Sequence, residues 1–515
     1  MKFALATPLV VYLSLLLDEL PLAQALRFPV EGRIGGFSHL EARSLGRLGR
    51  RASISGIPDI QNVGNVQYHT NVTLNGQQFS VLIDTGSSDL TVAGTVPGAS
   101  DTGKTGSVRY ALGDTKGPIK TATLEFEGFK VDKQAFIEQP VDSAHPEGGG
   151  IIGLGPGGAS EVQSQVGQGA GDPVLDRIFR QNTSTPNFIT ILLGRAEDPT
   201  DTFVGDFTVG EVVSPFENIT SQPRLPVTQM AHRSGQHWTA LLDPNGIIGP
   251  DGQRINTTKK STGNRLNVMF DSGFTFPQVT KGIASAIYQR VPGSQFTTVS
   301  NAPGKMWTVP CSTELNVTFV FANVSFPVHP LDTVTDAFRG PPDENGDPMC
   351  VGAFQPITTD QDGFDIILGM SFLRNAYMLV NFGDFVDGAL AKVGDPYVQL
   401  LPLTDPAEAH SDFVQVRMGG VDRSSDFKLL PALPNSDNDD DDDDSNSSDD
   451  TVHKYLPYII AGSVVGGLLI LGLILWAIFG KSGKKYRRLH DPAPAGLPGP
   501  NDHPPFAQYR PSRRY

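Results

Sequence analysis

Cysteine, tryptophan and basic charge are scarce in this chain of 515 residues. It has 2 cysteines and 3 tryptophans, and its 40 Lys and Arg residues against 55 Asp and Glu residues leave a net charge of −15. A chain this acidic lacks the basic surface that nucleic-acid binding requires. It contains no H-E-x-x-H zinc helix and no G-x-S-x-G nucleophile turn, and its histidines show no metal-ligand spacing. We therefore expect no nucleic-acid partner, no metal and no cofactor.

Glycine and proline, by contrast, are plentiful, with 56 and 40 residues. These counts suit many short strands joined by turns, and the length suits two lobes with extensions rather than one core. Asn75-Gly76 predicts a hairpin turn, and residues 172–179 predict a short helix with one apolar face. The predicted strands are Gln67–Leu74, Gln78–Ile83, Ala122–Phe126, Gln134–Ile137, Phe188–Leu193, Leu266–Phe270, Val317–Phe321 and Asp365–Leu368.

The first residues have the pattern of a secretory signal peptide. An apolar core at Ala6–Leu17 and a small-x-small site at Ala23-Gln24-Ala25 predict cleavage after residue 25. Residues 26–51 end in Arg50-Arg51, a natural cut for a kexin-type processing protease, and we interpret them as a propeptide; an unprocessed extension is the alternative. Asn-x-Ser/Thr sequons predict glycosylation, which fits a secretory route. The sequon residues are Asn71, Asn182, Asn218, Asn256, Asn316, Asn323 and Asn446.

A second apolar segment, 455–480, is bounded by lysines. Its centre, Ile459–Phe479, has 21 residues and would span roughly 31 Å as a helix, the thickness of a bilayer core. Basic residues follow at once, so the positive-inside rule places the tail 481–515 in the cytoplasm. The preceding residues, 406–453, are expected to form an acidic, disordered stalk. We therefore expect a single-pass type I membrane protein at the cell surface or in a vacuole-like compartment.

Two short triplets point to the chemistry: Asp84-Thr85-Gly86 and Asp271-Ser272-Gly273. Each follows a run of three apolar residues. Later in each half of the chain stands an apolar pair followed by a glycine, at Ile151-Ile152-Gly153 and Ile367-Leu368-Gly369. One Asp per half-chain, each at the end of a buried strand, is how a protein builds a shared carboxylate dyad. Two carboxylates a few ångströms apart share one proton and can activate a water molecule.

In these triplets and their partner pairs, the chain resembles the pepsin family of aspartic endopeptidases, in a membrane-anchored, fungal-type form. The resemblance runs from Gln67 to Leu401. It implies a mainly β, bilobal fold with catalytic lobes at 52–200 and 201–405. It also implies a monomer that hydrolyses peptide bonds in protein or peptide substrates, with Asp84 and Asp271 as the catalytic residues.

The resemblance also assigns roles to the neighbours of the two aspartates. Thr85 and Ser272 supply small hydroxyls that bond across the lobe interface. Gly86 and Gly273 let the backbone come close to the carboxylates. Ser87 bonds the outer oxygen of the first aspartate.

Two further features belong to the same comparison. Tyr110 stands where the family carries its flap tyrosine, the alternative being an ordinary strand tyrosine. Cys311 and Cys350 should form a disulfide in an oxidising compartment. The stretch Trp307–Cys311 is similar to the disulfide region in the second lobe of pepsin-like enzymes.

Four positions depart from the family pattern. Phe274 replaces a Thr or Ser, Thr91 replaces a Trp behind the flap, and Met370 and Asn381 replace acidic residues. Because Phe cannot donate a side-chain hydrogen bond to Asp271, we expect a raised pKa of the dyad or weaker activity. Two alternatives stay open: a pepsin-like membrane protein that binds peptide or glycan without cutting it, and a receptor or adhesion protein that signals through its tail.

Overall fold

The computed structural model describes residues 26–30, 61–62 and 67–431, with gaps at 111–112, 127, 143–144, 182–183, 197, 200–204, 231, 233–234, 258, 260–261, 300–304, 344–345, 347, 358–362 and 387–393. The predicted signal peptide, the Arg50-Arg51 site, most of the stalk, the apolar segment 455–480 and the tail all lie outside these residues. Among the described residues, no helix is long and apolar enough to cross a membrane.

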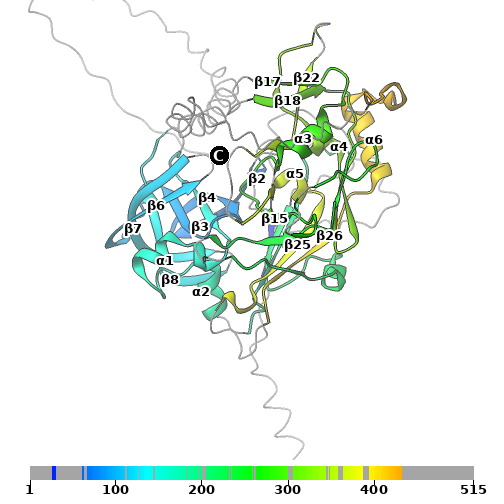
Figure 1. Ribbon diagram of the computed structural model, residues 1–515. Coiled ribbons are helices and arrows are strands. Elements are labelled where there is room, and N and C mark those ends of the chain that lie inside the picture. Colours follow the sequence, from blue (N-terminus) through cyan, green and yellow to red (C-terminus); the bar gives the residue numbers. More distant parts are fainter. Residues whose placement is uncertain are drawn as a thin grey trace, which may run out of the picture. The chain divides into compact units, whose positions relative to one another are not determined.

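The first half of the chain forms an eight-stranded sheet with the strand order β2-β3-β4-β9-β5-β8-β7-β6 (Figure 1). Asn75 and Gly76 have positive φ angles of 47° and 86° at the β3–β4 turn, as the hairpin prediction requires. The helices α1 (Glu161–Val166) and α2 (Val174–Gln181) follow the sheet, and α2 buries the predicted apolar face. The strands are β2 (Gln61–Asn62), β3 (Tyr68–Leu74), β4 (Gln77–Asp84), β5 (Leu90–Ala93), β6 (Ser100–Tyr110), β7 (Gly113–Phe126), β8 (Phe129–Gln139) and β9 (Gly149–Gly153).

A six-stranded sheet joins the two halves of the chain, in the order β1-β11-β10-β25-β26-β12. Its central pair, β10 and β25, is antiparallel and brings Ile189 opposite Val380. The edge strand β1 comes from the predicted propeptide and pairs with β11 along its whole length. The strands are β1 (Leu26–Val30), β10 (Phe188–Leu193), β11 (Gly205–Val209), β12 (Leu225–Pro226), β25 (Ala376–Asn381) and β26 (Tyr397–Pro402).

The second half adds three smaller sheets, in the orders β13-β15-β24-β16-β23, β14-β19-β20 and β17-β18-β22-β21. Their strands are β13 (Thr239–Leu241), β14 (Ile247–Ile248), β15 (Asn267–Phe270), β16 (Gln278–Val279), β17 (Gln295–Thr298), β18 (Lys305–Pro310), β19 (Val317–Phe321), β20 (Val324–Val328), β21 (Val334–Arg339), β22 (Met349–Gly352), β23 (Gln355–Pro356) and β24 (Ile366–Leu368). The helices are α3 (Lys281–Tyr288), α4 (Pro330–Thr333), α5 (Met370–Leu373) and α6 (Pro406–Arg417).

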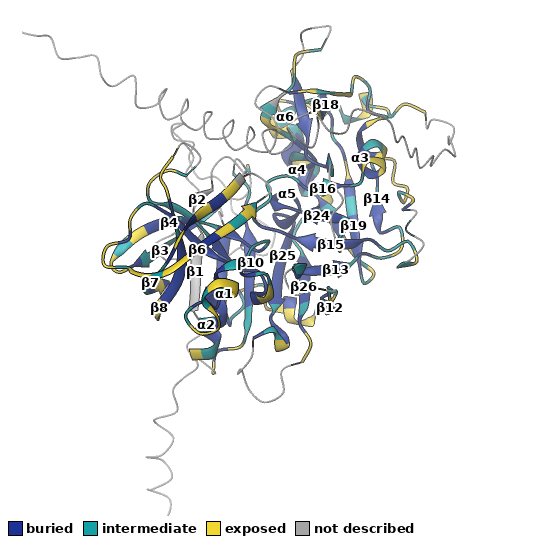
Figure 2. Ribbon diagram, turned by 60° about the vertical axis from the view of Figure 1, so that its left-hand side comes forward, coloured by how far each residue is buried: buried dark blue, intermediate teal, exposed yellow. Residues whose placement is uncertain are grey.

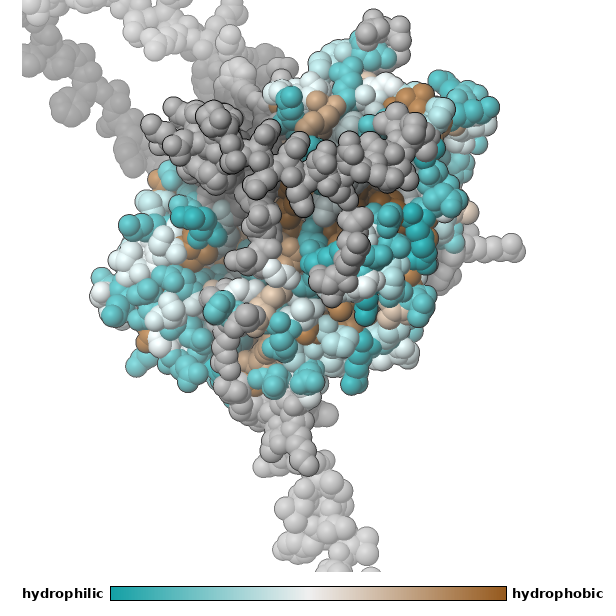
Figure 3. Space-filling model, viewed as in Figure 1, coloured by the Kyte–Doolittle hydropathy of each residue, from teal (hydrophilic) through white to brown (hydrophobic). Residues whose placement is uncertain are grey.

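Apolar side chains from both halves form one continuous core. Strands at the centre of the molecule are dark blue in Figure 2, while the rims of the β6–β7 hairpin and of α1 are exposed. The ring of Phe372 lies with its centroid 5.4–6.4 Å from those of Phe270, Phe319 and Phe321, in edge and tilted contacts. The ring of Phe270, the last residue of β15, also lies 5.6 Å from that of Phe321. Hydrophilic surface prevails on the outer parts of the molecule in Figure 3.

The five sheets confirm the mainly β fold expected from the sequence.

Helix α6 corrects the predicted boundary of the stalk. The sequence predicts a disordered stalk over residues 406–453, but Asp405 caps a 12-residue helix by accepting hydrogen bonds from the N–H groups of Ala407 and Glu408. Phe413 of this helix is fully buried. The chain then continues to Leu430, whose N–H and carbonyl both bond Arg290 of the second half. Asp and Pro at the start of a helix stabilise it, and burial of Phe413 attaches it to the fold.

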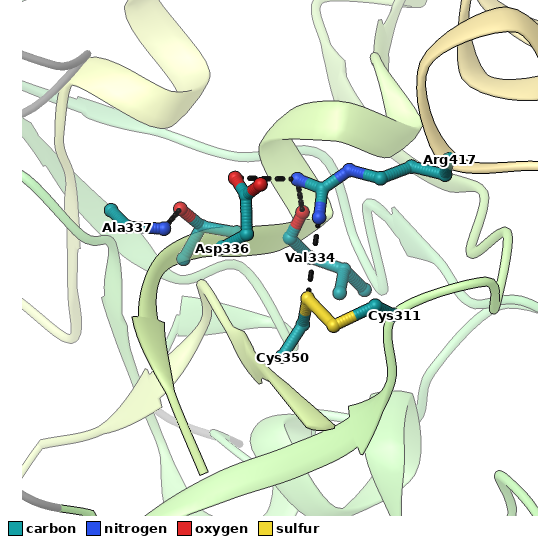
Figure 4. Close-up of a disulfide and its surroundings, with 7 residues drawn as sticks. Cys311, Val334, Asp336, Ala337, Cys350 and Arg417 are labelled. Carbon is teal, nitrogen blue, oxygen red and sulfur yellow. Dashed lines mark hydrogen bonds and ion pairs between the residues drawn. A yellow bond between two sulfur atoms is a disulfide. The ribbon is translucent and has the colours of Figure 1, made fainter. Parts of the chain in front are cut away.

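The predicted disulfide between Cys311 and Cys350 is confirmed, with Cα atoms 4.8 Å apart. Arg417, the last residue of α6, points at this disulfide in Figure 4 and donates a hydrogen bond of 3.2 Å to Sγ of Cys350. The same guanidinium bonds Asp336 at 2.9 Å. The disulfide, β21 and α6 are therefore joined through one arginine.

Candidate active site

Asp84 and Asp271 both lie where a buried strand ends beside a parallel partner. Asp84 is the last residue of β4, which runs parallel to β9 and is paired with Gly153. Asp271 directly follows β15, which runs parallel to β24, and its N–H donates to the carbonyl of Leu368. The two apolar pairs singled out in the sequence are these partner strands. The same local construction therefore occurs once in each half of the chain.

The two carboxyl groups meet across the interface between the halves. A Cβ atom on Gly86 would clash with the carboxylate of Asp271, and one on Gly273 would lie 2.5 Å from Oδ1 of Asp84. Both aspartates are buried, with exposures of 6% and 3%. Each glycine is therefore needed because its backbone lies directly against the carboxylate of the other half.

Thr85 and Ser272 bond each other reciprocally behind the carboxylates. The N–H of Thr85 donates to Oγ of Ser272 at 3.1 Å, and the N–H of Ser272 donates to Oγ1 of Thr85 at 2.9 Å. Each hydroxyl then donates to a backbone carbonyl of the opposite half, at Phe270 and Ile83. These four bonds, all buried, fix the two loops relative to each other.

The two aspartates differ in their hydrogen-bond donors. Asp84 accepts from the N–H of Gly86 at 2.9 Å and from the hydroxyl of Ser87 at 2.5 Å. Asp271 accepts from the N–H of Gly273 at 2.7 Å, and the backbone N–H of Phe274 also acts on it. Burial raises the pKa of Asp271 well above its ordinary value, and the charge of Asp84 raises it further. Asp271 is therefore the carboxyl that favours the protonated form.

Tyr110 lies beside Asp84, at the tip of the β6–β7 hairpin, where it pairs with Gly113. Burial, followed by the charges of Asp84 and Asp89, raises the pKa of Tyr110, so its phenol stays protonated. The hydroxyls of Ser87 and Thr91 act on the phenol from close range, although its oxygen makes no well-formed hydrogen bond among the described residues. The assignment of Tyr110 as a flap residue stays a prediction.

The sequence matches the model of the family described as eukaryotic aspartyl protease, over residues 67–386. The chain belongs to this family. "Major aspartyl peptidase 1" of Cryptococcus neoformans is 23% identical over 356 residues, which cover 62% of this chain and 68% of that protein. "Aspartic protease" of Phaffia rhodozyma is 27% identical over 341 residues, covering 61% and 73%. "Rhizopuspepsin" of Rhizopus chinensis is 22% identical over 365 residues, covering 66% and 82%. The chain is an aspartic-type endopeptidase.

In this aspartyl protease, residues that the sequence did not single out also support the site. Trp238 is fully buried, and its indole N–H donates to the carbonyl of Leu154 at 2.9 Å. The N–H of Leu154 donates in turn to the carbonyl of Asp84, and the N–H of Phe270 donates to the carbonyl of Trp238. One tryptophan thus connects the backbones beside both aspartates. Nothing local in the sequence indicates this role, because the contact between Trp238 and Leu154 spans 84 residues along the chain.

Asp89 is a second supporting residue that the sequence analysis missed. Its carboxylate accepts hydrogen bonds from the hydroxyl of Ser160 and from the N–H groups of Glu161 and Val162. It therefore holds the start of α1 against the strand that follows the Asp84 loop. Burial raises the pKa of Asp89, while these donors lower it. Within the described ranges, no cluster of His, Cys, Asp and Glu could hold a metal ion.

Proposed function

We propose that Asp84 and Asp271 are the catalytic dyad of this endopeptidase and that they hydrolyse peptide bonds with a water molecule held between them. The observation that carries the proposal is reciprocal: Gly86 lies against Asp271 and Gly273 lies against Asp84. The carboxyl groups of Asp84 and Asp271 therefore lie next to each other. Like charges so close cannot both ionise, so the pair shares a proton.

The roles of the two carboxyl groups follow from their surroundings. Asp271 holds the shared proton, because burial and the charge of Asp84 oppose its ionisation. Asp84, which accepts hydrogen bonds on both oxygens, takes a proton from the water as the water attacks the substrate carbonyl. Asp271 gives its proton to the carbonyl oxygen, which forms a tetrahedral diol. Asp84 then passes the proton from the water to the leaving nitrogen, and Asp271 takes back a proton from a diol hydroxyl as the C–N bond breaks. Tyr110 closes the site over the substrate and excludes bulk water.

We further propose that the enzyme enters the secretory pathway and is anchored by residues 455–480, with its lobes outside the cytoplasm and its tail 481–515 inside. The intact disulfide supports an oxidising compartment. Four sequon residues, Asn218, Asn256, Asn316 and Asn323, are exposed and Asn71 is half-exposed, so all five could accept a glycan. Residues 26–51 are a propeptide that a kexin-type protease removes at Arg50-Arg51. The site of residence is the cell surface or a vacuole-like compartment.

Membrane fractionation tests the topology. The full chain should sediment with membranes after alkaline carbonate washing, shift in mass on deglycosylation, and expose only a C-terminal tag to the cytoplasmic side. A variant lacking 455–480 should be released in soluble form with equal activity. Recovery of the washed full chain in the soluble fraction would contradict the anchor.

Replacement of Arg50 and Arg51 by Ala should leave the precursor uncut if that pair is the processing site.

A further inference from the structure

A tryptophan side chain makes a second link between the two halves of the chain, close to the dyad. Trp238 belongs to the second half, and its indole N–H donates to the carbonyl of Leu154 in the first half at 2.9 Å. The tryptophan is fully buried, and so is this hydrogen bond. The other link is the reciprocal pair of Thr85 and Ser272. The two loops that carry the aspartates are therefore tied together at two separate points.

At its first-half end, this link holds both ends of the Asp84 loop. The N–H of Leu154 donates to the carbonyl of Asp84 at 2.7 Å, and the N–H of Gly155 donates to the carbonyl of Ser87 at 2.6 Å. A Cβ atom on Gly155 would lie only 2.6 Å from the same carbonyl oxygen of Ser87, so the close approach requires glycine. A displacement of the Leu154 carbonyl would therefore move the Asp84 loop as a unit.

At its second-half end, the link is fixed next to Asp271. The N–H of Phe270, which directly precedes Asp271, donates to the carbonyl of Trp238 at 2.9 Å. The indole ring meets the ring of Phe382 edge-on, with centroids 4.8 Å apart, and stacks with that of Phe385 at 5.9 Å. Side chains packed in this way at the centre of a core keep one conformation. The indole N–H therefore stays directed at one point relative to the backbone beside Asp271.

We propose that Trp238 is a positioning residue whose indole N–H sets the separation of the Asp84 and Asp271 carboxyl groups, and with it how strongly they share a proton. The inference rests on the proposed catalytic dyad and goes beyond it by naming what fixes its geometry. The reciprocal threonine–serine pair alone would tie the loops at one point and allow them to tilt about it. The indole hydrogen bond removes that freedom.

The sharing of the proton depends steeply on distance. At a separation of roughly 3 Å, an increase of about 0.5 Å weakens the repulsion between two carboxylates enough to lower the upper pKa of the pair by about half a unit. The alkaline limb of kcat/KM reports this upper pKa. Loss of the indole donor should therefore move the alkaline limb to lower pH, whereas a tryptophan that only fills the core would alter stability and leave the limb in place.

The test deletes the indole N–H while keeping the shape of the side chain. Full-length enzyme with the substitution Trp238→benzothienylalanine, in which sulfur replaces the N–H group, is compared with the wild-type enzyme. The kcat/KM for one peptide is measured from about pH 3 to about pH 7. We expect the alkaline limb to lie about half a unit lower in the variant. Trp238→Phe also deletes the donor and should shift the limb in the same direction.

Two variants are matched controls. Phe382→Leu loosens the packing of the indole ring but keeps its donor, and Trp307→Phe makes the same exchange at a half-buried tryptophan outside the site. Both should leave the alkaline limb in place. The pH dependence of pepstatin affinity reports the same titration in any folded variant that no longer cuts.

The titratable neighbours of the dyad are the same in all these enzymes. Tyr110 and His237, on which the charge of Asp84 acts, and Asp89, whose charge acts on Tyr110, stay unchanged in every variant. A shift of the limb therefore reports on the dyad and not on a replaced titratable group.

The possible outcomes separate this inference from the dyad proposal. An unchanged alkaline limb and an unchanged pepstatin profile in the benzothienylalanine enzyme would overturn the inference and leave the dyad proposal intact. An equal shift in Phe382→Leu would also overturn it, because packing rather than the donor would then be responsible. Absence of cutting by the wild-type enzyme at any pH would instead contradict the dyad itself.

Discussion

The hydroxyl of Ser87 donates a hydrogen bond of 2.5 Å to Oδ2 of Asp84. The corresponding position after the second aspartate is Phe274, which has no hydroxyl. Only its backbone N–H acts on Asp271, while its carbonyl accepts from the N–H of Met370 at 2.8 Å. The two triplets are thus alike in backbone and unlike in the donors they offer. This asymmetry acts in the same direction as burial and the charge of Asp84, which raise the pKa of Asp271.

Phe274→Thr should shift the pH dependence of activity. The new hydroxyl would stabilise the ionised form of Asp271 and so lower its raised pKa. Activity requires one proton on the dyad, so the alkaline limb of kcat/KM should move to lower pH, by about one unit or less. Phe274→Leu, which adds no donor, is the matched control and should leave that limb in place. An equal shift in both variants would show that packing rather than the hydroxyl is responsible.

Asp271→Asn should stabilise the fold at neutral pH while abolishing activity. The pKa of Asp271 is raised in the folded state. The stability that its protonated form contributes is therefore present in acid and is lost as pH rises through the folded pKa. Asn cannot ionise and escapes this loss. The difference in thermal unfolding midpoint between variant and wild type should grow from about pH 3 to about pH 8. A difference independent of pH would contradict the raised pKa.

The hydroxyls of Thr91 and Tyr110 should act as a pair. Both oxygens are buried without a well-formed hydrogen bond among the described residues, and Thr91 acts on the phenol of Tyr110. Tyr110→Phe and Thr91→Val should each lower kcat/KM, and the double variant should lose less than the product of the two effects. A coupling energy of about 0.5 kcal/mol or more in the double-mutant cycle would confirm that the two hydroxyls interact. Strict additivity would show that Thr91 does not position Tyr110.

Much of the site could be predicted from sequence because its determinants are local. An apolar run followed by Asp, a small hydroxyl residue and Gly specifies a strand end, and the downstream apolar pair specifies its parallel partner. The β6 strand escaped prediction because most of its residues are exposed, so it has no alternation to detect. Helix α6 was not predicted because its apolar residues do not form a clear face, although Asp405 and Pro406 are typical of a helix start. Trp238 reaches the site through contacts distant in sequence, which no local pattern encodes.

Asp332→Asn should destabilise the enzyme strongly. Asp332 is buried, is ion-paired with Arg195 and Arg374, and accepts from the amide of Asn375 at 2.9 Å. Burial alone would raise the pKa of Asp332, but the two guanidinium groups outweigh it and hold the pKa below its ordinary value. Removing this charge leaves two arginines without their buried partner, which typically costs about 3–5 kcal/mol.

Urea unfolding at neutral pH measures this cost. Asp114→Asn is the control, because Asp114 forms an exposed ion pair with Arg109 at 3.6 Å, and such pairs contribute about 1 kcal/mol or less. Asp332 has a depressed pKa, so its contribution in the wild-type enzyme is present above the ordinary carboxyl pKa and is lost as pH falls through the folded value. Equal stability of the two variants would contradict the importance of the buried network.

Cleavage of a denatured protein by the full-length enzyme tests the central claim most directly. The wild-type chain, Asp84→Asn and Asp271→Asn would be assayed side by side from about pH 3 to about pH 7, with and without pepstatin. The account predicts that the wild-type enzyme cuts, that pepstatin stops it, and that either substitution abolishes the activity while the variant stays folded. Cutting by either folded Asn variant, or no cutting by the folded and processed wild-type enzyme at any pH, would contradict it.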